Sequence, residues 1–209
     1  MKTLAIIGSG DLGQQIAYYA IADKHYSNIV FFDDFETKEE IKGYKILGNT
    51  EDIESCYQQK LFDELIIGIG YKHLQKRKEL YDRFDKRIPF GKIIHSTVWQ
   101  DPSAIIKQGC VIYPSCSIDA NVNILENTIL NIGCTIAHDT KIGKHCFLSP
   151  RVALAGFINI EEQCIIGINA TVIDNLTVIR NTQIGGGTVV INNIEKPGLY
   201  VGNPYRFIR

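Results

Sequence analysis

The sequence lacks an excess of charge of either sign, because 22 Lys and Arg residues stand against 23 Asp and Glu residues. Balanced charge gives no reason to expect nucleic acid or an anionic membrane as a partner. The sequence also lacks an apolar secretory segment and any apolar run long enough to cross a membrane. We therefore expect a soluble, cytoplasmic protein without membrane insertion, built as one or two domains from 209 residues.

What the sequence does contain is a six-residue period from residue 103 to residue 192. Every block has a small or aliphatic second residue and an aliphatic fourth residue, as in SAIIKQ, GCVIYP and SCSIDA. A helical spacing of 3.6 residues would lose phase with this period within two blocks. Hexapeptide periods are typical of a parallel β-helix, in which three successive blocks close one coil. The same position then recurs one strand spacing away, at about 4.8 Å.

The cysteines fall within this period. Five of them take the second position of a block, where Ala, Val and Thr occur in other blocks: Cys110, Cys116, Cys134, Cys146 and Cys164. This pattern favours small buried hydrophobic residues over disulfides. The spacings match no zinc motif, so we expect no metal site.

The first 95 residues have a different pattern, in which apolar strands alternate with helices. A strand over Thr3–Ile7 leads into residues 8–13, a G-x-G-x-x-G motif, and then into a helix over residues 14–22. Such a turn brings backbone N–H groups close to a ligand phosphate at a helix N-terminus. Asp33 and Asp34 follow a second strand over residues 29–32, and an acidic residue at this distance commonly meets the ribose of a nucleotide.

The rest of this region predicts two more strands and two more helices. We expect a helix from Thr50, as its cap, to Lys60, a strand over residues 63–70, a basic helix over 72–86 and a strand over 92–95. This is half of a dinucleotide-binding fold, which favours a single nucleotide such as a nucleotide-sugar. Gly70 leaves room for a ligand, and His73 could line the same site.

The predicted architecture is thus a Rossmann-like α/β half domain followed by an all-β parallel β-helix. We place the nucleotide-sugar-binding domain at residues 1–95 and the β-helix domain at residues 96–192. Residues 193–209 break the period and form a capping tail, which would cover the edge of the last coil.

The candidate chemistry lies at a turn of the repeat. His138 is the sixth residue of its block, and the adjacent carboxylate of Asp139 can fix the tautomer of a general base. Gly156 lies three blocks later, at the same corner one coil along, where its backbone N–H can meet a developing oxyanion. The repeat alone leaves open that His138 is an exposed turn residue without a role. We expect His145 to lie at the surface.

A second corner of the repeat is smooth and apolar. It consists of Pro150, Ile168 and Gly186, which are three blocks apart from one another in turn. Such a column suits the pantetheine arm of a coenzyme, and it equally suits a subunit interface.

The residues that carry a resemblance to a known family are spread over the whole chain. They are Gly8-Ser9-Gly10, Phe32-Asp33-Asp34, Ile69-Gly70, Ala137-His138-Asp139, Ala155-Gly156, Ile184-Gly185-Gly186-Gly187 and Val201-Gly202-Asn203-Pro204. With them the chain resembles the sialic-acid O-acetyltransferase and bacillosamine-pathway N-acetyltransferase family of hexapeptide-repeat acyltransferases. The resemblance implies a left-handed β-helix, a homotrimer, and acetyl-CoA in the groove between neighbouring solenoids at Ile168 and Gly186.

The resemblance also implies roles for single residues. His138 is the base, Asp139 supports it, and the Gly156 N–H meets the acetyl carbonyl. The first domain holds a UDP-sugar through three groups of residues: Gly8, Ser9, Gly10 and Asp11 near the diphosphate, Asp33 and Asp34 near the nucleoside, and Gly70 and His73 in the pocket wall. Two positions depart from the family, since Phe147 and Asp11 stand where histidine is common. Phe147 lies at the coenzyme position close to the acyl group but cannot donate a hydrogen bond to the thioester.

The function expected from these features is acetyl-CoA-dependent N-acetylation of a UDP-linked amino sugar, expected to be a 4-amino sugar, for surface glycan biosynthesis. O-acetylation of a sugar such as sialic acid remains open, because amine and hydroxyl acceptors need the same base. A non-catalytic trimeric scaffold is a further alternative, which Phe147 keeps open. A nicotinamide oxidoreductase fits poorly, because the first domain is too short and the solenoid would be unexplained.

Overall fold

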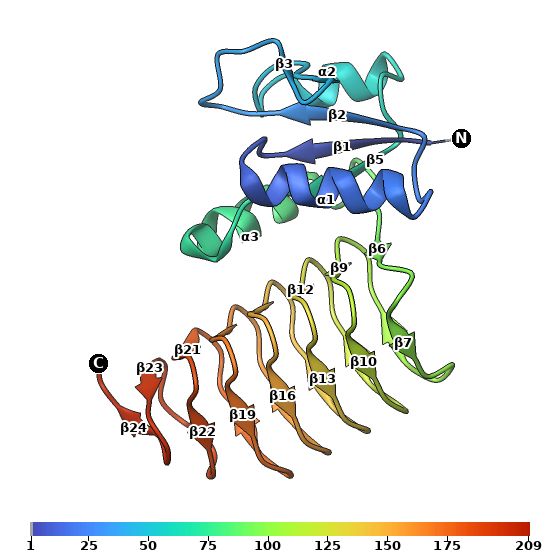
Figure 1. The fold of residues 1–209 in the computed structure, drawn as a ribbon. Helices are drawn as coiled ribbons and strands as arrows, with labels where there is room; N and C mark the ends of the chain where they lie inside the picture. The colour runs from blue at the N-terminus through green and yellow to red at the C-terminus, as the bar shows by residue number, and fades with distance from the viewer. Residues whose placement is uncertain (1) are drawn as a thin grey trace. The chain divides into compact units, whose positions relative to one another are not determined.

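The structure is a computed structural model, and it describes residues 2–209. The chain divides into two compact units, Met1–Ile93 and Ile94–Arg209, of which residue 1 lies outside the described residues. The division thus falls two residues before the boundary placed from the sequence. Each unit has its own apolar core, and Figure 1 shows the strands and helices from which each is built.

The first unit contains a parallel sheet of three strands in the order β2-β1-β5. The strands are β1 (Thr3–Ile7), β2 (Asn28–Phe32) and β5 (Glu64–Ile67). Their apolar residues are buried almost without exception, as expected for a parallel sheet covered on both faces. The strand expected over residues 63–70 is shorter in the structure, because β5 ends at Ile67. Gly68 and Gly70 lie in the loop that follows.

The helices of this unit are α1 (Asp11–Ala22), α2 (Ile53–Gln58) and α3 (Leu74–Phe84), with a 3₁₀ turn η1 (Tyr71–His73) before α3. A small hairpin joins β3 (Glu40–Ile41) to β4 (Tyr44–Lys45). The expectation that Thr50 caps the second helix is wrong, since Asp52 takes the cap position. Thr50 instead donates hydrogen bonds from its N–H and its hydroxyl to the carboxylate of Asp34.

The strand expected over residues 92–95 does not extend the β1 sheet. It is β6 (Ile93–Ile94), and it joins a sheet of the solenoid next to β9. The physical reason is the period: Ile94 lies three blocks before Ile112 and packs against the solenoid core. The first coil therefore begins before residue 103, where the repeat is still hard to see in the sequence.

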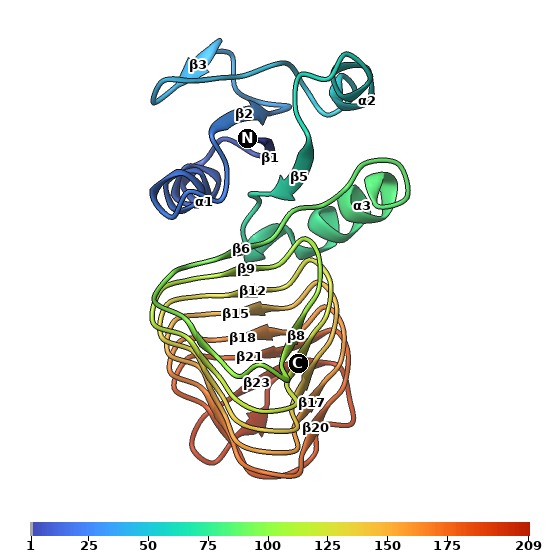
Figure 2. The same cartoon turned by 90° about the vertical axis from the view of Figure 1, so that its right-hand side faces the viewer.

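The second unit is a parallel β-solenoid whose coils consist of three short strands each (Figure 2). The first wall contains β6, β9 (Val111–Ile112), β12 (Ile129–Leu130), β15 (Phe147–Leu148), β18 (Ile165–Ile166) and β21 (Thr182–Ile184). The second wall contains β7 (Trp99–Gln100), β10 (Ser117–Ile118), β13 (Thr135–Ile136), β16 (Ala153–Leu154), β19 (Thr171–Val172) and β22 (Val189–Val190). The third wall contains β8 (Ile105–Ile106), β11 (Asn123–Ile124), β14 (Lys141–Ile142), β17 (Asn159–Ile160) and β20 (Thr177–Val178).

The register of these strands confirms the predicted coil of three blocks. Ser117 pairs with Thr135, and Thr135 pairs with Ala153, so each residue lies beside its equivalent in the next coil. The fourth residues of the blocks point inward and form one continuous buried core. The arrangement matches a left-handed β-helix, as expected.

After the first coil, each corner of the solenoid contains one residue in the left-handed backbone region. From residue 109 to residue 187, the first residue of each block has a φ between 55° and 75°. Asn and Gly, which tolerate this region best, hold the following positions: Gly109, Asn121, Asn127, Gly133, Asn169, Asn175, Asn181 and Gly187. The chain therefore turns by the same backbone device at each corner.

The cysteines of the repeat have a second role besides filling the core. The thiol of each donates to the carbonyl oxygen 15 residues further on, for example from Cys110 to Leu125 and from Cys146 to Glu161. The hydroxyls of Thr128 and Thr140 make the same bond at the same offset. A small side chain with a weak donor at the second position thus satisfies a corner carbonyl that lies at the edge of the core.

The tail after residue 192 ends the solenoid with two more strands. β23 (Gly198–Val201) pairs in parallel with β21, and β24 (Arg206–Phe207) then pairs with β23 in the antiparallel sense. Tyr200 of β23 is 5% exposed and belongs to the core. Among the helices of residues 2–209, none has the length and apolar character needed to cross a membrane.

Replacement of a core isoleucine tests this packing. We expect Ile142→Ala to lower the free energy of unfolding by about 2–5 kcal/mol, because it leaves a cavity between stacked coils. Lys141→Ala, on the outer side of the same strand, should change it by less than about 0.5 kcal/mol. Urea unfolding followed by circular dichroism measures both, and equal effects would contradict the inward and outward assignment.

Candidate functional site

A cavity of about 710 Å³ lies in the first unit, beside the carboxyl ends of its parallel strands. This is where ligands bind in open α/β sheets. The lining includes most of the residues predicted to bind substrate, namely Gly8, Gly10, Asp11, Asp33, Asp34, Gly70 and His73. Ser9 belongs to the same turn and is buried. The sequence-predicted set is therefore brought together in one place.

The glycine motif has the geometry that close approach of a phosphate requires. Gly8 has a φ of +98°, and a Cβ atom on Gly13 would lie only 1.9 Å from the Gly8 carbonyl oxygen. The helix can approach the turn this closely only because both positions lack a side chain. Gly10 has open space around its Cα and takes the N-cap position of α1, so its surroundings are free for a ligand.

Asp33 fixes the glycine turn to the end of β2. Its Oδ2 accepts hydrogen bonds from the N–H and the hydroxyl of Ser9, both at 2.7 Å, and its Oδ1 accepts from the N–H groups of Phe35 and Glu36. Burial acts to raise the pKa of Asp33, but these hydrogen bonds outweigh burial and hold the pKa below its usual value. Asp33 is thus a structural carboxylate in the wall of the cavity.

Sequence reasoning missed three contributors to this cavity. Phe35 and Lys76 line it, and the Phe35 side chain is 92% exposed. Arg77 is fully buried and donates to the carbonyl oxygens of Ile67 and Ile69, which fixes the loop that leads to Gly70. The helical spacing of His73, Lys76 and Leu80 could have indicated a common face, whereas Arg77 gave no such signal.

The second cluster lies in the solenoid, at the corner where the second and third walls meet. We call this the His138 corner, and it lies between β13 and β14. Nδ1 of His138 lies 3.0 Å from Oδ2 of Asp139, and the His138 side chain is 48% exposed. Nε2 has no hydrogen-bond partner among residues 2–209, so it is open to a substrate.

Gly156 lies directly against this imidazole. A Cβ atom at this position would lie 2.7 Å from Cε1 and 2.9 Å from Nε2 of His138. The ring therefore rests on bare backbone one coil away, as the spacing of three blocks predicted. Within the described part of the chain the Gly156 N–H has no acceptor, which leaves it available to an external oxygen.

Asn121 is a member of this cluster that sequence reasoning missed. Its side-chain amide donates to Oδ1 of Asp139 at 3.1 Å, while Oδ2 of the same carboxylate meets His138. Asn121 lies three blocks before Asp139, so the period that linked His138 to Gly156 could also have identified it. The two hydrogen bonds hold the carboxylate between a fixed amide and the imidazole.

Two other residues lie away from this corner. His145 is 2% exposed, so the expectation of a surface position is wrong; its Nδ1 lies 3.0 Å from the amide nitrogen of Asn127. His145 thus pairs with the equivalent residue one coil earlier, Asn127, which is itself buried. Phe147 is 5% exposed and lies on β15 in the first wall, so a single chain does not bring it to His138.

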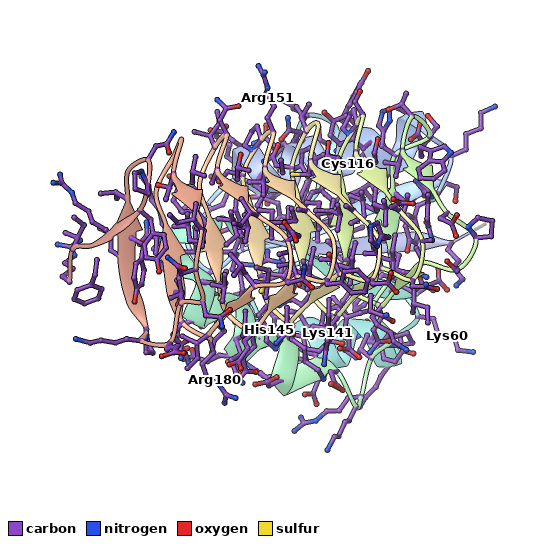
Figure 3. All side chains as sticks on the ribbon, turned by 90° about the horizontal axis from the view of Figure 1, so that it is seen from below. Lys60, Cys116, Lys141, His145, Arg151 and Arg180 are labelled. Carbon is purple, nitrogen blue, oxygen red and sulfur yellow. The ribbon has the colours of Figure 1, made fainter. Side chains whose placement is uncertain are left out.

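The apolar column predicted from the sequence lies at another corner, where the first and second walls meet. We call it the Ile168 corner. Ile168 is 50% exposed, and a Cβ atom on Gly186 would lie 3.0 Å from its Cγ2, so the two residues stack as expected. Arg151 projects from this edge, and Arg180 projects from the edge between the third and first walls, where it lies near Glu161 and Glu162 (Figure 3).

Cation ligands are not gathered anywhere in the described chain. No group of three or more His, Cys, Asp or Glu side chains in residues 2–209 is placed to hold a metal ion. All six cysteines lie within these residues; they are buried, and none of them forms a disulfide.

The lowered pKa of Asp33 predicts how stability changes with pH. Above the usual carboxyl pKa of about 3.9 the ionised group stabilises the fold, and this contribution is lost as the pH falls through the lower folded value. We expect Asp33→Asn to cost about 1 kcal/mol or more at pH 7 and progressively less below about pH 4. Urea unfolding at pH 3 to 7 measures this difference. Asp85→Asn, at the C-terminal end of α3, serves as a control that should lose nothing at pH 7.

Residues 3–84 match the family model of the PglD N-terminal domain. Over its full length the chain is similar to the acetyltransferase domain of PglB from Neisseria gonorrhoeae, with 27% identity, 100% coverage of both chains and a TM-score of 0.92.

Two further solved structures share the fold. PerB from Caulobacter crescentus, solved with CoA and GDP-perosamine, is 24% identical over 100% of this chain and 98% of its own, with a TM-score of 0.89. WeeI from Acinetobacter baumannii is 22% identical over 100% of both chains, with a TM-score of 0.86. The first unit therefore matches the PglD N-terminal domain, and over its full length the chain is similar to the acetyltransferase domain of PglB.

Proposed function

We propose that the protein transfers the acetyl group of acetyl-CoA to the amine of a nucleotide-linked amino sugar, a UDP-4-amino sugar in the first instance. The observation that carries this proposal is the His138 corner, where an imidazole with an open Nε2 lies against Gly156, whose backbone N–H has no acceptor among the described residues. The similar acetyltransferase domain of PglB has been solved with acetyl coenzyme A, which supports a coenzyme A thioester as the donor.

The geometry supports a direct transfer. The amine attacks the thioester carbonyl carbon, a C–N bond forms, and Nε2 of His138 accepts the proton that the amine loses. Asp139 at Nδ1 orients the imidazole and stabilises its cationic form. The Gly156 N–H donates to the oxyanion of the tetrahedral intermediate. The C–S bond then breaks, and the thiolate of coenzyme A takes up the proton from His138.

The site is proposed to be completed by a second copy of the chain within a homotrimer. The His138 corner and the Ile168 corner lie at opposite edges of the second wall, so one chain presents its base and its apolar column in different directions. A groove between two solenoids would place the Ile168 corner of one copy beside the His138 corner of the next. Small outward side chains such as Ala153 and Ala155 leave the second wall open to close packing.

The cavity of the first unit is proposed to hold the nucleotide. Its glycine turn and the N-terminus of α1 suit a diphosphate, and Lys76 adds a cation to the wall. Asp33 and Asp34 then act mainly by fixing the loops around the ligand, because both carboxylates already accept hydrogen bonds from this chain.

Release of free thiol from acetyl-CoA tests the reaction. We expect release with a UDP-4-amino sugar and a loss of at least about a hundredfold in kcat for His138→Ala, since a general base contributes about 10²–10⁴-fold. A GDP-4-amino sugar and free sialic acid form the comparison arms. Retention of most of the turnover in His138→Ala would remove the base assignment, and turnover with sialic acid alone would favour a hydroxyl acceptor.

Asn121 provides a finer test of the His138 corner. Loss of a hydrogen bond to a charged group costs about 1.5 kcal/mol, so we expect Asn121→Ala to lower kcat by about tenfold. Asn181→Ala is a matched control, because Asn181 has the same left-handed backbone conformation at a different corner. Equal kcat values for the two variants would show that Asn121 does not act through Asp139.

A further inference from the structure

Phe157 stands in a backbone conformation that an aromatic residue rarely adopts. Its φ is +57°, in the left-handed region where a Cβ atom meets steric hindrance. Asn or Gly takes this position in most other blocks of the solenoid. The Phe157 side chain is 55% exposed, so burial of the ring in this chain does not account for its presence. Residues held in such conformations concentrate at functional sites.

The position of Phe157 connects it to the His138 corner. It lies three blocks after Asp139, one coil along the same edge, and directly follows Gly156. Its N–H donates to the carbonyl oxygen of His138 at 3.1 Å. The equivalent residues in other coils of this edge are polar, namely Ser103, Asn121 and Asn175. An aromatic ring therefore appears on this edge only in the coil that faces the imidazole.

The ring of Phe157 makes an edge-to-face contact with the imidazole. The two centroids are 5.2 Å apart, and the ring planes meet at 86°. This is a favourable arrangement for two aromatic rings. His138 is thus held on three sides: Asp139 bonds Nδ1, the Gly156 backbone lies beneath the ring, and Phe157 stands beside it.

A half-exposed histidine would otherwise be free to change its rotamer. Rotation about its side-chain bonds would move Nε2 away from the Gly156 N–H, and the base and the oxyanion donor would no longer face one reacting centre. A displacement of about 1 Å at such a centre can cost about a hundredfold in rate. A ring at residue 157 that keeps His138 aligned would therefore benefit catalysis enough to compensate for the backbone strain.

We propose that Phe157 is a positioning residue for His138, retained despite its backbone strain because its ring fixes the imidazole. This inference rests on the proposed function, in which His138 is the base. It assigns to Phe157 an effect on kcat and not on the binding of either substrate. It also implies that stability and turnover favour different residues at position 157: Asn would fit the left-handed backbone better, whereas Phe supports the reaction.

The test compares Phe157→Asn with Phe157→Tyr and with Gln163→Asn. Gln163 has a φ of 56° at the corner between the third and first walls, away from His138, so its replacement by Asn relieves the same strain elsewhere. We expect both Asn variants to keep or raise Tm, by up to about 2–4 °C. Only Phe157→Asn should lower kcat, by about tenfold or more, with both KM values unchanged within about twofold. Phe157→Tyr, which keeps the ring, should retain kcat.

Each outcome decides one point. An unchanged kcat in Phe157→Asn overturns the inference, and a fall confined to KM for acetyl-CoA makes Phe157 a coenzyme contact instead. If the wild type transfers no acetyl group, the proposed function is wrong. The positioning role can still be tested by NMR of the ring nitrogens and ring protons of labelled histidine. A single set of His138 ring signals in the wild type that broadens or shifts in Phe157→Asn supports it, and unchanged signals contradict it.

Discussion

The structure of the second unit depends on one backbone constraint, which is a left-handed residue at each corner from residue 109 to residue 187. Each such residue turns the chain from one wall to the next, and because the turns recur with every block, three of them close a coil in which the chain returns above itself. The continuous core, the parallel ladders between coils and the thiol and hydroxyl bonds to corner carbonyls all follow from this return. The cost is backbone strain wherever the corner residue is neither Gly nor Asn. This strain is low at most corners, because Gly or Asn stands there, and it is higher at the remaining corners, of which residue 157 is one.

The same return assembles the chemistry. Asn121, Asp139 and Phe157 are equivalent residues of successive coils, and His138 and Gly156 are equivalent residues one position earlier. Side chains that are far apart in an ordinary chain are thus about one strand spacing apart here. A polar ladder runs along this edge, from Asn121 through the carboxylate of Asp139 to the imidazole. The first unit uses a different principle, since its cavity is formed by loops at the ends of strands and is secured by Asp33, Asp34 and Arg77.

Most of the solenoid and the main pair at the His138 corner could be predicted from the sequence, because a fixed period converts residue number directly into position. The same arithmetic would have found Asn121. Prediction from the period failed for residues whose position depends on an irregular block or on a contact with a distant residue. Ile94 is in phase with the core, but its block is too irregular to recognise. His145 is covered by a coil-to-coil contact that hydrophobicity does not report, and Thr50 is taken from its expected helix cap by the distant carboxylate of Asp34. The buried Arg77 donates to backbone carbonyl groups, and every residue has such a group, so the sequence gives no signal for this contact.

The coil period also limits how such a chain can change in length. An insertion of one whole block between Asp139 and Gly156 would preserve the hexapeptide pattern, every inward aliphatic residue and the corner conformations, so the solenoid could still form. It would nevertheless rotate all later blocks by one wall and move Gly156 to a different edge from His138. Only insertions or deletions of three whole blocks return each later side chain to its own edge. Insertions of any number of whole blocks therefore preserve the fold, whereas only multiples of three blocks keep the residues of the site on one edge. Coils can thus be added outside the segment from Asn121 to Phe157 far more readily than within it.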